Sequence, residues 1–123
     1  MGGAVVTDDA EKDGRYVFLV LLQVQPAWLR LDRSARNGKA DAVRAIVGRH
    51  RAVAVRWLDA EAFASGCTDV LLVETADPWA WYRCWEEVRD TELFSTPYFV
   101  VERIVTTVED GYQRYERELV PDS

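Results

Sequence analysis

The stretch RYVFLVLLQV, from Arg15 to Val24, decides the fold because it is apolar on both sides. In an extended chain, successive side chains point to opposite faces. One face carries Tyr16, Phe18, Val20, Leu22 and Val24, and the other carries Val17, Leu19, Leu21 and finally Gln23. A strand with one face in water alternates apolar and polar residues. This stretch therefore predicts an inner strand that is covered on both faces.

Length and composition predict one ordinary globular domain. The chain has 123 residues, of which 49% are hydrophobic and 29% charged. We expect residues 1–14, rich in Gly and Asp, to form a flexible N-terminal arm, and residues 15–120 to form a single domain. The net charge of -6 and the lack of a basic stripe argue against nucleic acid as a partner.

Location is predicted from what the sequence lacks. No apolar run approaches the roughly 20 residues of a membrane span. The start, MGGAVVTDDAEKDG, does not have the basic-then-apolar order of a signal peptide. Cys67 and Cys84 fit no metal or redox spacing and are expected to be buried free thiols. These features predict a cytoplasmic protein with no membrane partner.

Strands and helices alternate along the rest of the chain. We expect strands at about 15–24, 52–59, 69–75 and 98–106. A helix ending near Arg49 starts either after a cap at Asp32 or Ser34, or at Lys39, because Asn37-Gly38 is a turn signal. A second helix starts at Asp77-Pro78. A last helix is expected from about Thr107, with Asp110 at capping-box spacing.

The order β-α-β-β-α-β, followed by a C-terminal helix, predicts an α+β ferredoxin-like fold. It has a four-stranded antiparallel sheet with both long helices on one face. The other face has a footprint of about 400 Å² from strand spacing and rise. A second copy related by a two-fold axis covers such a face economically. We therefore expect a homodimer through the sheet face, of the dimeric α/β-barrel type. A bound ligand or the last helix could cover part of this face instead.

Charged residues within the predicted strands are candidates for catalysis. If Trp57 and Val73 face the helices, Arg56 and Glu74 face the other side of the sheet. Glu74 is the candidate acid or base, and Arg56 the candidate partner for a developing oxyanion. An intersubunit salt bridge explains the same pair structurally.

The remaining candidates would bind a substrate. Trp57, Tyr98 and Trp28 are aromatic residues suited to a cleft for a planar ligand, whereas Gln23 and Glu102 are polar groups on strands. Asp59, Glu61 and Asp69 surround the connection between the second and third strands, where they either bind a cation, act as a base or cap turns.

No cofactor or metal is expected. His50 is the only histidine and lies at the expected end of a helix. The helix dipole favours a positive charge there, so we expect this structural role and not catalysis or haem ligation. No Ser, Cys or glycine-rich catalytic motif and no metal-ligand spacing is present.

Three parts of the sequence resemble the darcynin family, small bacterial proteins of unassigned function. They are FLVLLQVQPAWLRL, VRWLDAEAFASGCTDVLLVET, and the pair PYFVVERI and VEDGYQRYERE. The resemblance covers roughly residues 16–118, and it brings no catalytic residue. A looser similarity is to dimeric α/β-barrel proteins, which include cofactor-independent monooxygenases, polyketide cyclases, haem enzymes and binding proteins.

Two functions remain open. The first is a tailoring enzyme that acts on a hydrophobic or aromatic compound by cofactor-independent acid/base chemistry, monooxygenase- or cyclase-like, in a barrel cavity. The alternative is a non-catalytic dimeric protein of the darcynin family that binds a ligand or another partner.

Overall fold

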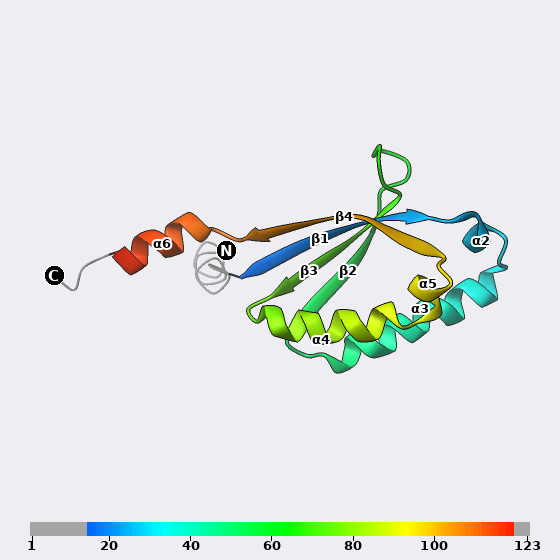
Figure 1. Ribbon diagram of the computed structural model, residues 1–123, viewed down its shortest axis with the longest axis horizontal. Helices are drawn as coiled ribbons and strands as arrows, with labels where there is room; N and C mark the ends of the chain where they lie inside the picture. Colours follow the sequence, from blue (N-terminus) through cyan, green and yellow to red (C-terminus); the bar gives the residue numbers. More distant parts are fainter. Residues whose placement is uncertain (1–14, 120–123) are drawn as a thin grey trace, which may run out of the picture.

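A four-stranded antiparallel sheet forms the centre of the protein (Figure 1). The computed structural model describes residues 15–119, so the arm predicted at residues 1–14 lies outside them. The sheet has the order β2-β3-β1-β4, formed by β1 Tyr16–Val24, β2 Val53–Asp59, β3 Asp69–Thr75 and β4 Phe99–Val108. The continuously apolar strand β1 is an inner strand, as the sequence predicts, because β3 and β4 pair with its two edges.

Two long helices, α3 Arg33–Arg49 and α4 Pro78–Arg89, lie side by side on one face of the sheet (Figure 1). Two short helices, α2 Pro26–Leu29 and α5 Glu92–Ser95, occupy connections that the sequence left irregular. Apart from these two short helices, and with α6 Gly111–Leu119 at the end, the described elements follow the order β-α-β-β-α-β-α. The α+β ferredoxin-like fold is confirmed.

The core lies between the helices and one face of the sheet. Val20 and Leu22 of β1 are fully buried, as is Val73 of β3. Cys84 and Val88 of α4 close the core from the helix side. The face of β1 that begins at Tyr16 is therefore the helix side, as predicted from its alternation.

Helix α3 starts at its early candidate position. The side chain of Asp32 accepts a 2.8 Å hydrogen bond from the backbone N–H of Ala35, so Asp32 and not Ser34 is the cap. Asn37 and Gly38 continue the helix, because a cap and a packed apolar stripe outweigh the roughly 1 kcal/mol that glycine costs in a helix. The alternative start at Lys39 was wrong.

The last helix starts later than predicted. Strand β4 continues to Val108 because it stays paired with β1 to Tyr16, and the Thr107 hydroxyl donates to the carbonyl of Val17. Helix α6 begins only at Gly111. It lies beyond the end of the β1–β4 ribbon and not over the sheet, so it does not cover the open face of its own chain (Figure 1).

Strand β4 contains a β-bulge opposite Leu21 and Leu22. Arg103 pairs with Leu21 and Val101 with Leu22, which leaves Glu102 as the extra residue. A bulge reverses the alternation of the side chains that follow it. Phe99 therefore lies on the helix side before the bulge, and Ile104 lies on that side after it.

The second face of the sheet has no covering layer among residues 15–119. Its apolar residues are partly exposed in β1, β3 and β4: Val17, Leu19, Leu21, Val70, Leu72, Val100 and Val105. We call this surface the open face. On the edge strand β2 it continues with Ala54, Arg56 and Leu58, which are exposed.

Candidate functional site

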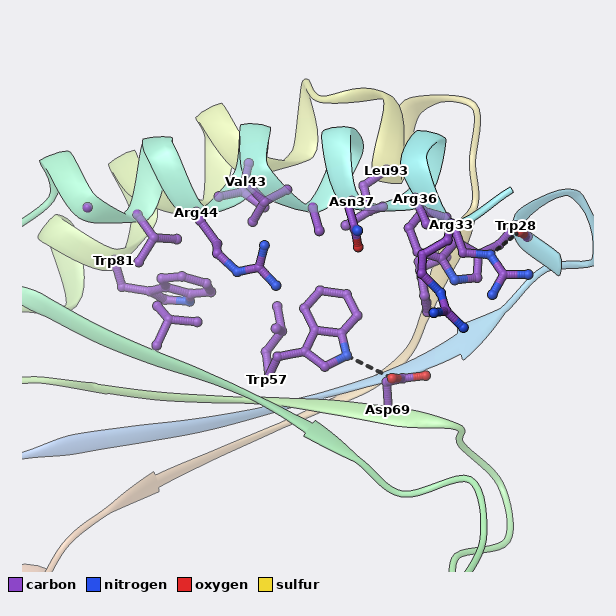
Figure 2. Close-up of a pocket in the computed structure, with 17 residues that line it drawn as sticks. Trp28, Arg33, Arg36, Asn37, Val43, Arg44, Trp57, Asp69, Trp81 and Leu93 are labelled. Carbon is purple, nitrogen blue, oxygen red and sulfur yellow. Dashed lines mark hydrogen bonds between the residues drawn. The ribbon is translucent and has the colours of Figure 1, made fainter. Parts of the chain in front are cut away.

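A pocket of about 700 Å³ lies between α3 and the helix side of β2 and β3 (Figure 2). Its volume falls in the range of small-molecule sites, roughly 300–1,000 Å³. Besides Trp28 and Trp57, the apolar side chains of its lining are Ala40, Val43, Val47, Val55, Leu71, Trp81, Val88, Leu93 and Phe99. The pocket is therefore an incompletely filled part of the core.

Trp57 forms one wall of the pocket and is held in place by Asp69. The indole Nε1 of Trp57 donates a 2.7 Å hydrogen bond to Oδ2 of Asp69 (Figure 2). The Trp57 ring also packs edge-on against Phe99, with 5.1 Å between centroids. Trp57 remains 39% exposed, so one side of the indole is available to a ligand.

Trp28 forms the wall at one end of the pocket, away from Trp81 (Figure 2). Its ring lies 5.2 Å from that of Phe99 and 5.7 Å from that of Tyr98. Arg36 of α3 fixes this segment, because its guanidinium donates to the carbonyl oxygens of Trp28 at 3.2 Å and Leu29 at 3.0 Å. Helix α2 is thereby attached to the start of α3.

Polar side chains of α3 line the pocket opposite the sheet. Arg33, Arg36, Asn37 and Arg44 extend from α3 toward the sheet, and they share one side of the helix with Ala40 (Figure 2). Arg44 forms an exposed 2.7 Å ion pair with Asp41. Within residues 15–119, the side chain of Arg33 has no ion-pair or hydrogen-bond partner. Asp69 is the only carboxylate of the lining.

The predicted substrate-binding residues are divided among different places. Trp57 and Trp28 line the pocket. Tyr98 lies behind Trp28, and its ring is 5.4 Å from Nζ of Lys39. Gln23 lies on the open face opposite Val100, and Glu102 is the exposed bulge residue of β4. The structure therefore does not bring these five side chains together.

Arg56 and Glu74 lie on the open face, on the other side of the sheet from the pocket. Glu74 pairs with Ala54 and Arg56 with Leu72, so the two are diagonal neighbours on adjacent strands. Their common face was predicted correctly. No ion pair within 4 Å joins them. Their catalytic role stays a prediction.

His50, the C-cap of α3, forms a side-chain contact with Glu87 of α4. Its Nε2 lies 2.5 Å from Oε2 of Glu87, and Arg49 approaches the other carboxylate oxygen at 3.2 Å. The hydrogen bond from His50 is the main cause of a lowered pKa of Glu87, and Arg49 adds to it. His50 does not line the pocket. Over residues 15–119, no group of three His, Cys, Asp or Glu side chains could hold a metal ion.

The arginines of α3 were missed because the start of the helix was uncertain. Once the helix begins after Asp32, positions 33, 36, 37, 40 and 44 fall on one side of it. Three of these five positions are arginine in a chain with a net charge of -6. That pattern was the available signal. For Asp69, the sequence indicates only that it is one of three carboxylates near the connection between two strands.

The fold and its pocket place the protein among α+β ferredoxin-like proteins with a small-molecule-sized cavity. Similar solved structures are chlorite dismutases from Candidatus Nitrospira defluvii. The one in complex with imidazole has a TM-score of 0.72 and 12% identity over 85% of this chain and 44% of that chain. A mutant in complex with cyanide gives 0.70 and 13%, over 83% and 42%. The chain thus spans less than half of those chains, and the likeness shows the fold.

Residues 5–121 match the family model described as "Darcynin, domain of unknown function", so the chain belongs to the darcynin family. Darcynin from Chromobacterium violaceum is 39% identical over 77 residues, which are 63% of this chain and 98% of that protein. Darcynin 1 from Acinetobacter baumannii is 35% identical over 77 residues, 63% of this chain and 86% of that protein. Within residues 15–119, no helix is both long and apolar enough to cross a membrane.

Proposed function

We propose that this darcynin binds a small hydrophobic or aromatic compound in the pocket between α3 and the sheet. The observation that carries the proposal is a cavity of about 700 Å³ whose walls are Trp28 and Trp57 and whose floor is core aliphatic residues. A well-packed core leaves few voids larger than one water molecule. A cavity of this size with aromatic walls is therefore a candidate ligand site.

The contacts around the two tryptophans support a pre-formed site. Trp57 is fixed by Asp69, and Trp28 is fixed through the contacts of Arg36 with α2. A rigid aromatic wall loses little conformational entropy when a flat ligand packs against it. The pocket therefore favours planar or aromatic compounds over flexible chains.

Binding of the neutral fluorescent probe phenylnaphthylamine tests this proposal. Ala40→Leu fills part of the pocket from α3, and we expect about tenfold weaker binding, a loss of about 1.4 kcal/mol. Ala45→Leu makes the same change at an exposed position of α3 and is the matched control. Circular dichroism should show both variants folded. Failure of the wild type to bind, or equal affinities of the two variants, would overturn the proposal.

A second candidate function is acid/base tailoring of the same class of compound at the open face, without a cofactor. The observation that favours it is the diagonal placement of Glu74 and Arg56, which no ion pair joins. Glu74 would take a proton from the substrate, and Arg56 would stabilise the enolate or phenolate oxygen. Both the monooxygenase-like and the cyclase-like reaction need such a step.

Mass spectrometry of aromatic compounds incubated with the protein tests this second candidate. Glu74→Gln keeps the size of the side chain and removes the base, so product formation should be lost. Glu86→Gln makes the same change on the exposed surface of α4 and should leave the product yield unchanged. Full turnover by Glu74→Gln, or none by the wild type, would exclude the assignment.

We also propose that the open face pairs with the same face of a second copy. Two footprints of about 400 Å² fall short of the roughly 1,200 Å² of a stable interface. Helix α6 can supply further area, because Tyr112 is 70% exposed and Tyr115 and Leu119 are also exposed on one side of it. Because the β1–β4 pairing continues to Tyr16 and Val108, α6 is directed away from its own sheet.

The oligomeric mass tests the homodimer. Wild type should show twice the monomer mass of 14.1 kDa in light scattering. Leu19→Glu, in the middle of the open face, should give a folded monomer, as should Leu72→Lys on the neighbouring strand. Ala45→Glu places a charge on the outside of α3 and should remain dimeric. A monomeric wild type, or dimers in both sheet variants, would refute this interface.

A further inference from the structure

We infer that the compound bound in the pocket carries an acidic head group, such as a carboxylate or sulfonate, and that Arg33 and Arg36 hold this group beside Trp28. The inference rests on the proposed ligand-binding function and adds the chemical class of the ligand. It makes the pocket an amphipathic site, apolar in its interior and cationic at the Trp28 end.

The charge of the pocket is opposite to that of the chain. The chain has a net charge of -6. The lining contains three arginines and one aspartate, which gives a local charge of +2 when both signs are counted. Local potentials of this kind attract small charged ligands into a cleft. The positive potential of the pocket therefore stabilises a bound anion and destabilises a bound cation.

Arg33 is available for such an anion. It has no ion-pair partner among residues 15–119, although it lies on the same pocket wall as Arg36 (Figure 2). Asp69 does not form an ion pair with Arg33 within 4 Å, and it accepts a 2.7 Å hydrogen bond from Trp57 instead. An unpaired guanidinium beside an apolar cavity offers a bidentate site for a carboxylate.

Arg36 lies one helical turn from Arg33 and is already ordered. Its Nε and one Nη donate to the carbonyls of Trp28 and Leu29, so its position is fixed before a ligand arrives. A guanidinium group carries five N–H donors, so Arg36 keeps donors that these two bonds do not use. The same side chain therefore positions the Trp28 wall and adds positive charge at the head-group end.

Arg44 lies at the other end of this row. It lies eleven positions after Arg33, which is about 16 Å along a helix. It is also engaged with Asp41. One small head group therefore contacts the Arg33 end or the Arg44 end and not both. Of these two arginines, Arg33 is the one without an ion-pair partner among residues 15–119.

The test compares two fluorescent probes of similar shape, neutral phenylnaphthylamine and anionic anilinonaphthalene sulfonate. Wild type should bind the sulfonate about tenfold more tightly than the neutral probe. Arg33→Gln should remove most of this preference, because it should weaken binding of the sulfonate much more than binding of the neutral probe. Arg51→Gln removes the same charge at an exposed position outside the pocket and should keep the preference.

The outcomes separate the inference from the proposed function. If the neutral probe does not bind, the ligand-binding function itself fails. If the neutral probe binds and the sulfonate binds no more tightly, the pocket stands and the acidic ligand class is overturned. An equal loss in Arg51→Gln would show that net charge alone acts. A larger loss in Arg44→Gln than in Arg33→Gln would overturn the assignment of the head group to the Trp28 end.

Discussion

The Trp57 indole and the Asp69 carboxylate join two strands at the pocket, with 2.7 Å between donor and acceptor. The two residues are diagonal neighbours, since Trp57 pairs with Leu71 and Asp59 with Asp69. An indole N–H has one donor and no acceptor, so a carboxylate is a suitable partner. The bond turns an exposed tryptophan of an edge strand into a fixed wall.

This bond should be measurable by a double-mutant cycle. Trp57→Phe removes the donor, and Asp69→Asn weakens the acceptor. We expect a coupling free energy of about 1 kcal/mol in chemical denaturation, because the bond is charge-assisted but exposed. A coupling near zero would mean that the two side chains are independent in solution.

The cap at Asp32 fixes where α3 begins and therefore where its arginines lie. Asp32→Ala should lower the free energy of unfolding by about 1 kcal/mol, since the backbone N–H of Ala35 loses its acceptor. Ser34→Ala is the control, and it should change stability by less than about 0.5 kcal/mol. Equal effects of the two substitutions in urea denaturation would contradict the assigned cap.

The carboxyl group of Glu87 should make the stability of the fold decrease at acidic pH. The hydrogen bond from His50, and less strongly Arg49, holds the pKa of Glu87 below its ordinary value of 4.5. A carboxyl group with a lowered pKa stabilises the fold above its unfolded pKa, and this contribution is lost as pH falls through the folded pKa.

Melting temperatures between pH 7 and pH 3 would measure this contribution. Wild type should melt above Glu87→Gln at neutral pH, and the difference should shrink below about pH 4.5. Glu86→Gln, one position earlier and facing Arg89, is the comparison. A difference between wild type and Glu87→Gln that stays constant over this range would show that the charge of Glu87 is not responsible.

Cys84 should be protected from thiol reagents. It is fully buried, and burial is the main cause that raises its pKa to about 11. At pH 8 its thiolate is therefore scarce as well as shielded. In a Cys67→Ser variant, labelling of Cys84 should follow global unfolding and be complete only in denaturant. Rapid labelling of the native protein would contradict the packing of α4 against the sheet.

The sequence predicted the parts of the fold that depend on local signals. The apolar run of β1 identified an inner strand, and Asp77-Pro78 marked the start of α4, where the Asp77 side chain caps the N–H of Trp79. The predicted face of Trp57 was also correct. In each case neighbouring residues carry the signal, and tertiary contacts only confirm it.

The pocket depends on contacts that no local pattern reports. Asn37-Gly38 is a turn signal, so the sequence did not show whether the first turn of α3 forms. The side of the helix on which Arg33 lies was therefore not predicted. The bulge at Glu102 reversed the alternation of β4, so its side chains could not be assigned to faces by counting. Trp28 and Trp57 were recognised as aromatic candidates, but the pocket that both of them line follows from how α3 packs on β2 and β3.

The pleat of β3 separates two surfaces at adjacent positions. Leu71 forms part of the pocket floor, whereas Leu72 lies on the open face. One residue can therefore vary with the chemistry of the bound compound while its neighbour in the chain varies with the partner surface. In darcynins that retain this strand, ligand choice and assembly can therefore evolve independently. Each can change through substitutions at neighbouring positions of the strand, without a change of fold.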